Sequence, residues 1–354
     1  MPLIAVTPYG AGGASARVRV LDWIEHLDLP CAVHDYLGAT NASPMTLLTR
    51  APAVLRAEQA LRQLDVSTST VLLHREASPL SSGDLETRLL QGALRSVYDI
   101  DDALQWDVRH GVRAIAPKHV KAERCARTAD VVVAGSELLA DWASRFSREV
   151  HLVPSCVQVQ DYSPKVSYET STHPIIGWVG SPSTEKYLRL LEKPLLDLYR
   201  RVGARLLVVS AGEASLGALD PMVVRVPWDP TTVGRVMNSF DVAIAPLVPD
   251  LFSRGKCAYK ILQYGAAALP IVGSRVGANR LVLGKLGAAS AVGVDEWGLQ
   301  LSDILAAPAS DRAAMGGQAR SAVERHYSFA AWEGVMRRLL RDEPPTSGGR
   351  LPRA

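Results

Sequence analysis

Short runs of apolar, mostly β-branched residues alternate with longer amphipathic stretches along the whole chain. In the first half these runs lie at 3–6, 31–36, 70–74, 96–100 and 130–135. Runs of four to six residues rich in Val and Ile, separated by helical patterns, are typical of buried parallel strands with crossover helices. The alternation restarts in the second half, with runs at 174–180, 204–210, 223–228, 241–247 and 269–274. The sequence therefore predicts an α/β protein with two doubly wound, Rossmann-like domains.

A polar stretch without apolar periodicity separates the two halves. Residues 160–172 carry Ser, Thr, Pro and charged residues, which is the composition of a linker. We therefore expect an N-terminal domain at 1–159 and a C-terminal domain at 173–326. A last helix is predicted at 327–342, followed by a frayed tail at 343–354.

The composition narrows the classes of function. The chain has 354 residues, of which 47% are hydrophobic, enough for two well-packed cores. Its 39 Lys and Arg residues nearly balance 36 Asp and Glu residues, which excludes a strongly cationic nucleic-acid binder. Four widely separated cysteines without CxxC spacing disfavour a disulfide framework and a zinc site. Without a secretory signal or an 18-residue apolar run, we expect a cytoplasmic protein with no transmembrane segment, for which peripheral membrane contact stays open.

The segments that follow the predicted strands are the candidate sites, because open parallel sheets bind ligands beyond the carboxyl ends of their strands. Three glycines follow the first strand: Gly10, Gly12 and Gly13. Arg17 and Arg19 lie just inside the next helix, which suits an anionic or polyhydroxyl ligand. A tight strand-to-helix turn is an alternative. A dinucleotide fingerprint is another, with Asp35 as the ribose acid and Ser15 at the third glycine position.

Three carboxylates follow another strand in the segment VYDIDDALQW. Asp99 and Asp101 would share one face of an extended chain, with Asp102 on the other. Clustered carboxylates suit a divalent cation that holds a nucleotide diphosphate. They could instead form a metal-free site in which Asp101 or Asp102 orients sugar hydroxyls or acts as a base. Capping of the next helix by Asp102 is the third interpretation.

The first strand of the second half ends in GWVGSPST. Ser181 suits an N-cap, with Pro182 at the first helical position. That arrangement would leave the amides of Ser183 and Thr184 free to bind an anion, although capping alone would select the same residues.

The segment SRGKCAYKILQYG follows a later strand and carries two lysines. Lys256 and Lys260 lie four residues apart, so we expect them on one face of a helix that starts near Ser253, Arg254 and Gly255. Cations at a helix N-terminus predict a diphosphate site, and a solvated surface is the alternative.

These motifs together resemble the retaining GT-B glycosyltransferases of glycosyltransferase family 4. The resemblance covers nearly the whole chain, and its segments include ASARVRV, VYDIDDALQW, IIGWVGSPST and KCAYKILQYGAAALPIVGSRVGAN. It implies two Rossmann-like domains that face each other across a cleft, with the acceptor bound by the first and the nucleotide sugar by the second. The last helix, which contains Trp332, would cross back to the first domain.

The resemblance also assigns roles by position, with some departures. Gln263 and Gly255 stand where the family has a pair of acids, and Ser181 and Pro182 stand where it commonly has an Arg. Asp101 corresponds to the family's cleft histidine. We expect catalytic contributions from three residues, namely Asp101, Lys256 and Lys260. The donor-binding candidates are Gly12, Gly13, Gly180, Ser181, Val226, Trp228, Arg254 and Gln263. The acceptor-binding candidates are Arg17, Asp99 and Asp102, and no residue is expected to bind a metal.

The resulting prediction is a metal-independent hexosyltransferase without a cofactor. It would move a sugar from a nucleotide diphosphate, with UDP favoured, to a small-molecule or glycan acceptor bearing a hydroxyl or amine, with retention of configuration. Two alternatives stay open: a non-catalytic nucleotide-sugar-binding protein on the same fold, motivated by Gly255 and Gln263, and an NAD-dependent oxidoreductase, motivated by Gly10, Gly12 and Asp35.

Overall fold

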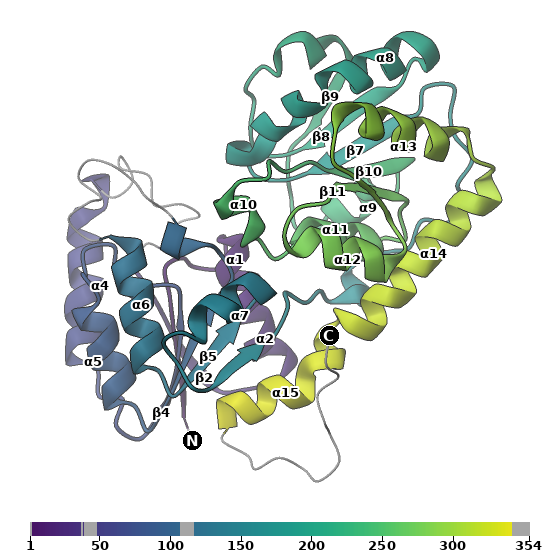
Figure 1. The fold of residues 1–354 in the computed structure, drawn as a ribbon. Coiled ribbons are helices and arrows are strands. Elements are labelled where there is room, and N and C mark those ends of the chain that lie inside the picture. The colour runs from purple at the N-terminus through teal and green to yellow at the C-terminus, as the bar shows by residue number, and fades with distance from the viewer. Residues whose placement is uncertain (1, 37, 39–47, 107–116, 342–354) are drawn as a thin grey trace. The chain divides into compact units, whose positions relative to one another are not determined.

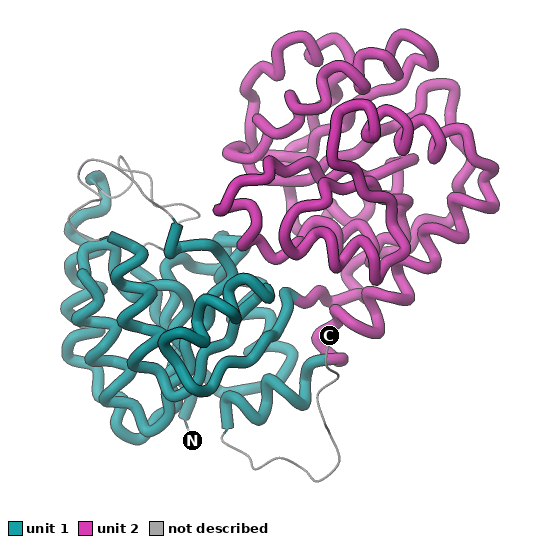
Figure 2. Tube along the Cα trace, in the orientation of Figure 1, with its two compact units in different colours: residues 1–155, 332–354 teal, residues 156–331 magenta. Residues whose placement is uncertain are grey.

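The computed structural model describes residues 2–36, 38, 48–106 and 117–341. The chain divides into two compact units, shown in separate colours in Figure 2. Unit 1 comprises Met1–Ser155 with Trp332–Ala354, and unit 2 comprises Cys156–Ala331. The predicted boundaries at 159 and 326 lie a few residues away from these divisions. Val157 and Val159 account for the first difference, because both pack in the core of unit 2.

Unit 1 contains a six-stranded parallel sheet in the order β2-β1-β3-β4-β5-β6 (Figure 1). Its strands are β1 (Leu3–Thr7), β2 (Cys31–Asp35), β3 (Thr70–His74), β4 (Arg95–Ile100), β5 (Val131–Ala134) and β6 (Val150–Leu152). Every residue of β1, β3 and β5 is buried, which explains why these strands have continuous apolar sequences. The direction of strand succession reverses between β1 and β3, so the segments after Thr7 and His74 border the expected ligand crevice.

Helices flank both sides of this sheet (Figure 1). They are α1 (Ala14–Ala16), the π-helical turn η1 (Arg17–Leu21), α2 (Asp22–His26), α4 (Ala51–Gln63), α5 (Asp84–Gly92), the 3-10 turn η2 (Leu104–Trp106), α6 (Lys118–Thr128), α7 (Glu137–Ala143) and α15 (Phe329–Arg341). The chain returns to unit 1 in α15, where Met336, Leu339 and Leu340 are buried and Arg95 donates to the carbonyl of Leu339.

Unit 2 contains a second six-stranded parallel sheet, in the order β12-β11-β10-β7-β8-β9. Its strands are β7 (Ile175–Val179), β8 (Arg205–Val209), β9 (Val223–Val226), β10 (Val242–Ala245), β11 (Ile271–Ser274) and β12 (Ala289–Ala291). Alternate residues enter different core layers, since Trp178 and Ile244 pack in one and Val179 and Ala245 in the other. The succession of strands reverses between β7 and β10.

Helices and 3-10 turns of unit 2 cover both faces of its sheet. They are η4 (Val159–Asp161), η5 (Pro182–Leu191), α8 (Glu192–Val202), η6 (Gly217–Met222), α9 (Val233–Met237), α10 (Leu251–Arg254), α11 (Tyr259–Ala266), α12 (Ala278–Leu286), α13 (Val294–Ala306) and α14 (Ala309–His326). None of the helices within the described ranges has the length and apolarity needed to cross a bilayer.

The segment predicted as a linker, 160–172, packs on unit 2. Tyr162 belongs to the hydrophobic core of that unit, and the amide of Lys165 donates to the carbonyl of Ala267. The hydroxyl of Tyr168 donates to the carbonyl of Ala268 at 2.6 Å. The polar sequence thus forms a segment without strands that is held on unit 2 by hydrogen bonds. The predicted tail at 343–354 lies outside the described residues.

Candidate functional site

The three carboxylates that follow β4 occupy different environments. Asp99 has no exposed side-chain surface and forms a bidentate ion pair with Arg19, which is equally buried. Arg19 also donates to the carbonyl of Val153 at 2.8 Å. The Nδ1 atom of His74 lies 2.7 Å from Asp99 Oδ2. Asp99, predicted to bind the acceptor, offers no side-chain surface to a ligand.

Asp101 lies at the partly exposed edge of the same cluster, where 11% of its side chain is accessible. Its Oδ1 accepts a hydrogen bond from Arg75 Nε at 2.6 Å, and its Oδ2 accepts one from Ser15 Oγ at 2.7 Å. Asp102 Oδ2 contacts the same guanidinium at 3.4 Å. Arg75 holds a positive φ of 62°, which is costly for a side chain of this size. The backbone thus turns sharply to place one guanidinium between two carboxylates.

The pKa values of these carboxyl groups reflect their ion pairs. Burial would raise the pKa of Asp99, but Arg19 and the hydrogen bond from His74 outweigh it and hold the pKa below its ordinary value. Burial would also raise the pKa of Asp101, but the charges of Arg75 and then His74 outweigh it and hold this pKa well below its ordinary value. Both groups are therefore carboxylates at neutral pH. Within the described part of the chain, no group of three or more His, Cys, Asp or Glu side chains is arranged to hold a metal ion.

The glycine-rich turn after β1 brings Ser15 to this cluster. Gly13 is buried, and a Cβ on it would lie 2.6 Å from Tyr9 Cβ, so the turn requires glycine there. Gly12 is exposed and Arg17 is half-buried at the start of η1. π-Helical turns often occur at functional sites.

Gly10 and Asp35 lie side by side, as the dinucleotide alternative would require. A Cβ on Gly10 would lie 3.4 Å from Asp35 Oδ2. The other oxygen of Asp35 already accepts a hydrogen bond from the amide of Gly38. Ser15, at the third glycine position, is engaged with His74 and Asp101.

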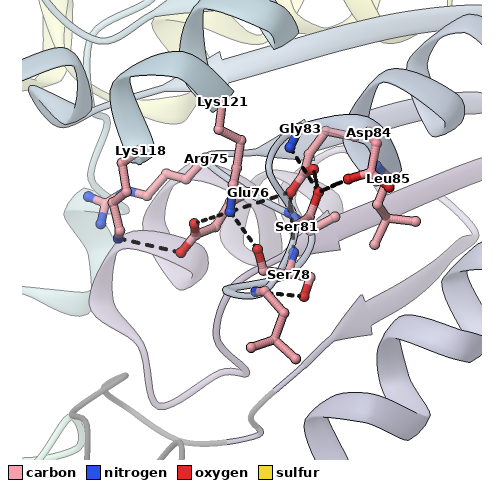
Figure 3. Close-up of polar contacts among 12 residues, drawn as sticks. Arg75, Glu76, Ser78, Ser81, Gly83, Asp84, Leu85, Lys118 and Lys121 are labelled. Atoms are coloured by element: carbon pink, nitrogen blue, oxygen red, sulfur yellow. Dashed lines mark hydrogen bonds and ion pairs between the residues drawn. The ribbon is translucent and has the colours of Figure 1, made fainter. Parts of the chain in front are cut away.

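A second polar network holds the loop after β3, as Figure 3 shows. The buried ammonium of Lys121 lies 2.9 Å from Glu76 and donates to the carbonyl of Ser78 at 2.5 Å. Lys118 approaches the other oxygen of Glu76 at 3.4 Å. Burial would raise the pKa of Glu76, but Lys121 and Lys118 lower it to about 2. The network therefore fixes the loop that follows the carboxyl end of β3.

In unit 2, Lys260 lies over the end of β7. Its Nζ is 4.9 Å from the centre of the Trp178 ring, and a Cβ on Gly180 would come within 2.6 Å of that nitrogen. The hydroxyl of Tyr264, one turn further along α11, accepts from the amide of Val179 and donates to the carbonyl of Ile244. Tyr264 thus ties α11 to β7 and β10, the two strands at which the strand order reverses.

The electrostatic environment of Lys260 is unusual. Burial, and then the charge of Lys256, lower the pKa of Lys260 to about 7. Lys260 makes no hydrogen bond or ion pair with any residue in the described ranges. An ammonium in this position lacks a counter-charge, and an anion beside it would supply one.

The prediction that Lys256 and Lys260 share one helical face is wrong. The segment forms two helices, since α10 ends at Arg254 and α11 begins at Tyr259, and Lys256 lies in the turn between them. The turn includes Ala258 at a positive φ of 55°. Lys256 still acts on Lys260 electrostatically, while its Nζ lies 4.8 Å from the centre of the Phe252 ring.

The prediction for Ser181 needs a similar correction. Pro182 begins the 3-10 segment η5, but the hydroxyl of Ser181 makes no capping bond to a backbone amide. It instead lies 3.1 Å from Ser183 Oγ and 3.3 Å from Thr184 Oγ1. The amide of Thr184 donates to the carbonyl of Ser181 at 2.9 Å, so it is not free to bind an anion.

The other donor-binding candidates are more dispersed. Val226 and Trp228 lie at the end of β9, where the backbone of Ser210 pairs with both. Arg254 is exposed at the end of α10. Gln263 is buried, and its Nε2 donates to the hydroxyl of Tyr162 at 2.9 Å. Direct proximity is shown for Gly180 and Lys260, and an electrostatic interaction for Lys256 and Lys260.

Sequence reasoning overlooked His74 and Arg75 and did not pair Arg19 with Asp99. The missed signal was position: His74 ends β3, whose neighbour β4 ends in the three carboxylates. Carboxyl ends of adjacent parallel strands meet at one edge of the sheet, so polar residues there should have been read together.

No protein-family model and no curated protein matches this chain. Solved structures do resemble it. HepE from Anabaena, in complex with UDP and glucose, has a TM-score of 0.69 at 13% identity, over 97% of this chain and 100% of that one. A UDP-forming α,α-trehalose-phosphate synthase from Burkholderia vietnamiensis has a TM-score of 0.68 at 11% identity, over 97% and 100% of the two chains. TarM has a TM-score of 0.60 at 13% identity, and the match covers 80% of this chain but only 57% of TarM.

At these identities the similarity concerns the fold. Two parallel six-stranded sheets, each flanked by helices, match these structures over nearly the whole chain. The predicted fold class is therefore confirmed: the protein has the GT-B fold, with two Rossmann-like domains.

Proposed function

We propose that this protein is a glycosyltransferase that moves a sugar from a nucleotide diphosphate, with a UDP-sugar as the favoured donor, to a hydroxyl or amine acceptor. Lys260 is the observation that carries the proposal. It is a half-buried ammonium without a counter-charge, next to Gly180 and close to Lys256, beyond the strand ends where α/β sheets bind ligands. HepE, which shares the fold, was solved with UDP and glucose.

Under this proposal, unit 2 binds the donor. Lys256 and Lys260 neutralise the charge that develops on the departing diphosphate, because preorganised donors stabilise such charge in the transition state. Backbone amides near Ser181 add hydrogen bonds. Val226 and Trp228 contact the nucleobase.

Unit 1 binds the acceptor under the same proposal. Asp101 and Asp102 are its partly exposed carboxylates, and Arg17 lies on the neighbouring turn. A carboxylate oxygen accepts a hydrogen bond from an acceptor hydroxyl and so orients it for attack. We further propose that transfer retains the anomeric configuration, that the acceptor is a small molecule or a glycan, and that the protein acts in the cytoplasm.

The proposal is tested with nucleotides and nucleotide sugars. Calorimetry with UDP, GDP and dTDP measures donor recognition, and mass spectrometry after incubation with a panel of their sugars and acceptors detects transfer. Absence of binding to every nucleotide diphosphate contradicts the proposal. Binding without transfer or hydrolysis supports the non-catalytic alternative, and enhanced NADH fluorescence on mixing supports the oxidoreductase.

Activity is expected to survive removal of divalent cations by EDTA. Asp99 and Asp101 are already paired with Arg19 and Arg75, and the lysines of unit 2 supply positive charge for the diphosphate. Transfer rates measured with and without EDTA should agree. Loss of activity with EDTA and its rescue by Mn²⁺ would show that a cation handles the donor.

Asp101→Asn is expected to slow transfer while nucleotide affinity stays unchanged. The substitution removes the charge and the basic oxygen from the acceptor side, for which a loss of about 10²- to 10⁴-fold is typical of acid–base residues. Steady-state kinetics and calorimetry with UDP measure the two quantities. Loss of UDP binding in this variant would show that unit 1, rather than unit 2, holds the donor.

A further inference from the structure

Four side chains of unit 1 form a continuous hydrogen-bonded chain from the protein interior to the partly exposed Asp101. Asp99 Oδ2 lies 2.7 Å from His74 Nδ1, and His74 Nε2 lies 2.7 Å from Ser15 Oγ. Ser15 Oγ donates to Asp101 Oδ2 at 2.7 Å. The chain joins α1, the first helix after β1, to the ends of β3 and β4, at the point where the strand order reverses.

Counting protons shows that this chain accommodates one proton beyond those of a neutral imidazole and two carboxylates. Asp99 is ionised and only accepts, so His74 Nδ1 must donate to it. Ser15 has a single hydroxyl proton, yet His74 Nε2 and Asp101 both lie at hydrogen-bond distance from it. Both contacts are satisfied when an added proton resides on His74 Nε2 or on Asp101. Without that proton, one of the two contacts would bring two hydrogen-bond acceptors together with no proton between them, which is unfavourable.

The hydrogen-bond geometry places the added proton at His74 Nε2. The charged groups that face His74 are Asp99 and Arg19 on one side and Asp101 and Arg75 on the other. Arg75 keeps Asp101 ionised, so Asp101 alone is a poor base. His74 Nδ1 is engaged with Asp99, so Nε2 is the ring atom that faces Ser15 and is available to take up a proton. Neither His74 nor Asp99 has exposed side-chain surface, so Asp101 is the partly exposed end of the chain.

We propose that Asp101, Ser15 and His74 form a proton relay that receives the proton of the attacking acceptor hydroxyl. The inference rests on the proposed glycosyl transfer. As the acceptor oxygen forms its bond to the anomeric carbon, its O–H bond breaks and the proton passes to Asp101. Asp101 passes a proton to Ser15 Oγ, and Ser15 passes its own to His74 Nε2. The nucleotide diphosphate leaves with the electron pair of the broken glycosyl bond, and the proton returns along the chain to solvent after the product departs.

Ser15→Ala tests the relay, because it removes the central hydroxyl and keeps Asp101 and His74. We expect kcat to fall by about 10²- to 10⁴-fold, as for loss of acid–base assistance, with the KM of the donor unchanged. Ser15→Thr keeps a hydroxyl and should restore most of the activity.

Ser96→Ala is the matched control. Ser96 is a buried serine at the opposite end of β4, and its hydroxyl donates to a carboxylate, Asp130, at 2.9 Å. Its loss should leave kcat as in the wild type. An active wild type with an equally active Ser15→Ala variant, or an equal loss in Ser96→Ala, overturns the relay while the proposed transferase stands.

A measurement on the protein without substrates distinguishes a failure of the proposed relay from a failure of the proposed glycosyl transfer. In ¹⁵N NMR spectra of histidine-labelled protein, Ser15→Ala should shift the Nε2 signal of His74 and leave Nδ1, bonded to Asp99, unchanged. An unshifted Nε2 signal contradicts the chain even if transfer is observed. A shifted signal in a protein that transfers no sugar overturns the proposed function, and with it the relay role, while supporting the hydrogen-bonded chain.

Discussion

Replacing Asp99 with Asn should lower the free energy of unfolding by about 3 to 5 kcal/mol, the usual cost of removing one partner from a buried ion pair. Asp99 and Arg19 both have side chains with no exposed surface, so the substitution leaves a guanidinium without a counter-charge in the interior. It also removes the anionic partner of His74. Urea unfolding followed by circular dichroism measures the change. A loss below about 1 kcal/mol, typical of exposed pairs, would contradict this assignment.

Asp102→Asn serves as the control for that experiment. The side chain of Asp102 is 18% exposed and its contact with Arg75 is long, at 3.4 Å. Its loss should cost about 1 kcal/mol or less. A similar loss of stability in both variants would show that removing either carboxylate of this segment is destabilising, whether or not it belongs to the buried ion pair.

The stability contributed by Asp99 should also depend on pH in a defined direction. Its pKa is lower in the folded protein than in the unfolded chain. The contribution is therefore fully present above the unfolded value, about 3.9 for an Asp, and is lost as the pH falls through the folded value. The stability difference between the wild type and Asp99→Asn should narrow in acid, and a difference that widens would contradict the ion pair.

The fold could be predicted because the buried parallel strands leave a strong pattern in the sequence. Residues 3–6 and 174–180 are mostly apolar because they fall in the regions of β1 and β7, which have a neighbouring strand on each side. The short edge strands β6 and β12 were missed. Each has three residues, mostly half-buried, in the sequences VHL and ASA, so neither has an apolar run.

The candidate site could be predicted only where conspicuous polar residues directly follow a predicted strand. The carboxylates after β4 were found because three acids in four residues are conspicuous. Their partners were not found, because Arg19 is 80 residues from Asp99 in sequence and meets it only through the fold. The break between α10 and α11 was missed for a local reason: Gly255, which caps the end of α10, was assigned to the start of a helix, and Ala258 adopts a positive φ that alanine rarely takes.

The affinity for UDP is expected to weaken above pH 7 through the deprotonation of Lys260. Its pKa is about 7 in the unliganded protein, whereas a bound diphosphate would stabilise the charged form, so binding takes up a proton. Well above pH 7, where the phosphate groups are already ionised, the affinity should fall by about 10-fold per pH unit. Calorimetry in buffers of different ionisation enthalpy measures both the affinity and the proton uptake.

Variants of Lys260 distinguish the effect of its positive charge from the effect of its deprotonation near pH 7. Lys260→Ala should lower the transfer rate by about 10²-fold, the size of losing one strong transition-state donor, and Lys256→Ala should have a similar effect. Lys260→Arg keeps a charge that does not titrate in this range, so it should flatten the pH dependence of UDP binding while retaining affinity. An equally steep pH dependence in Lys260→Arg would show that another group takes up the proton. UDP affinity unaffected in Lys260→Ala would show that the diphosphate binds elsewhere.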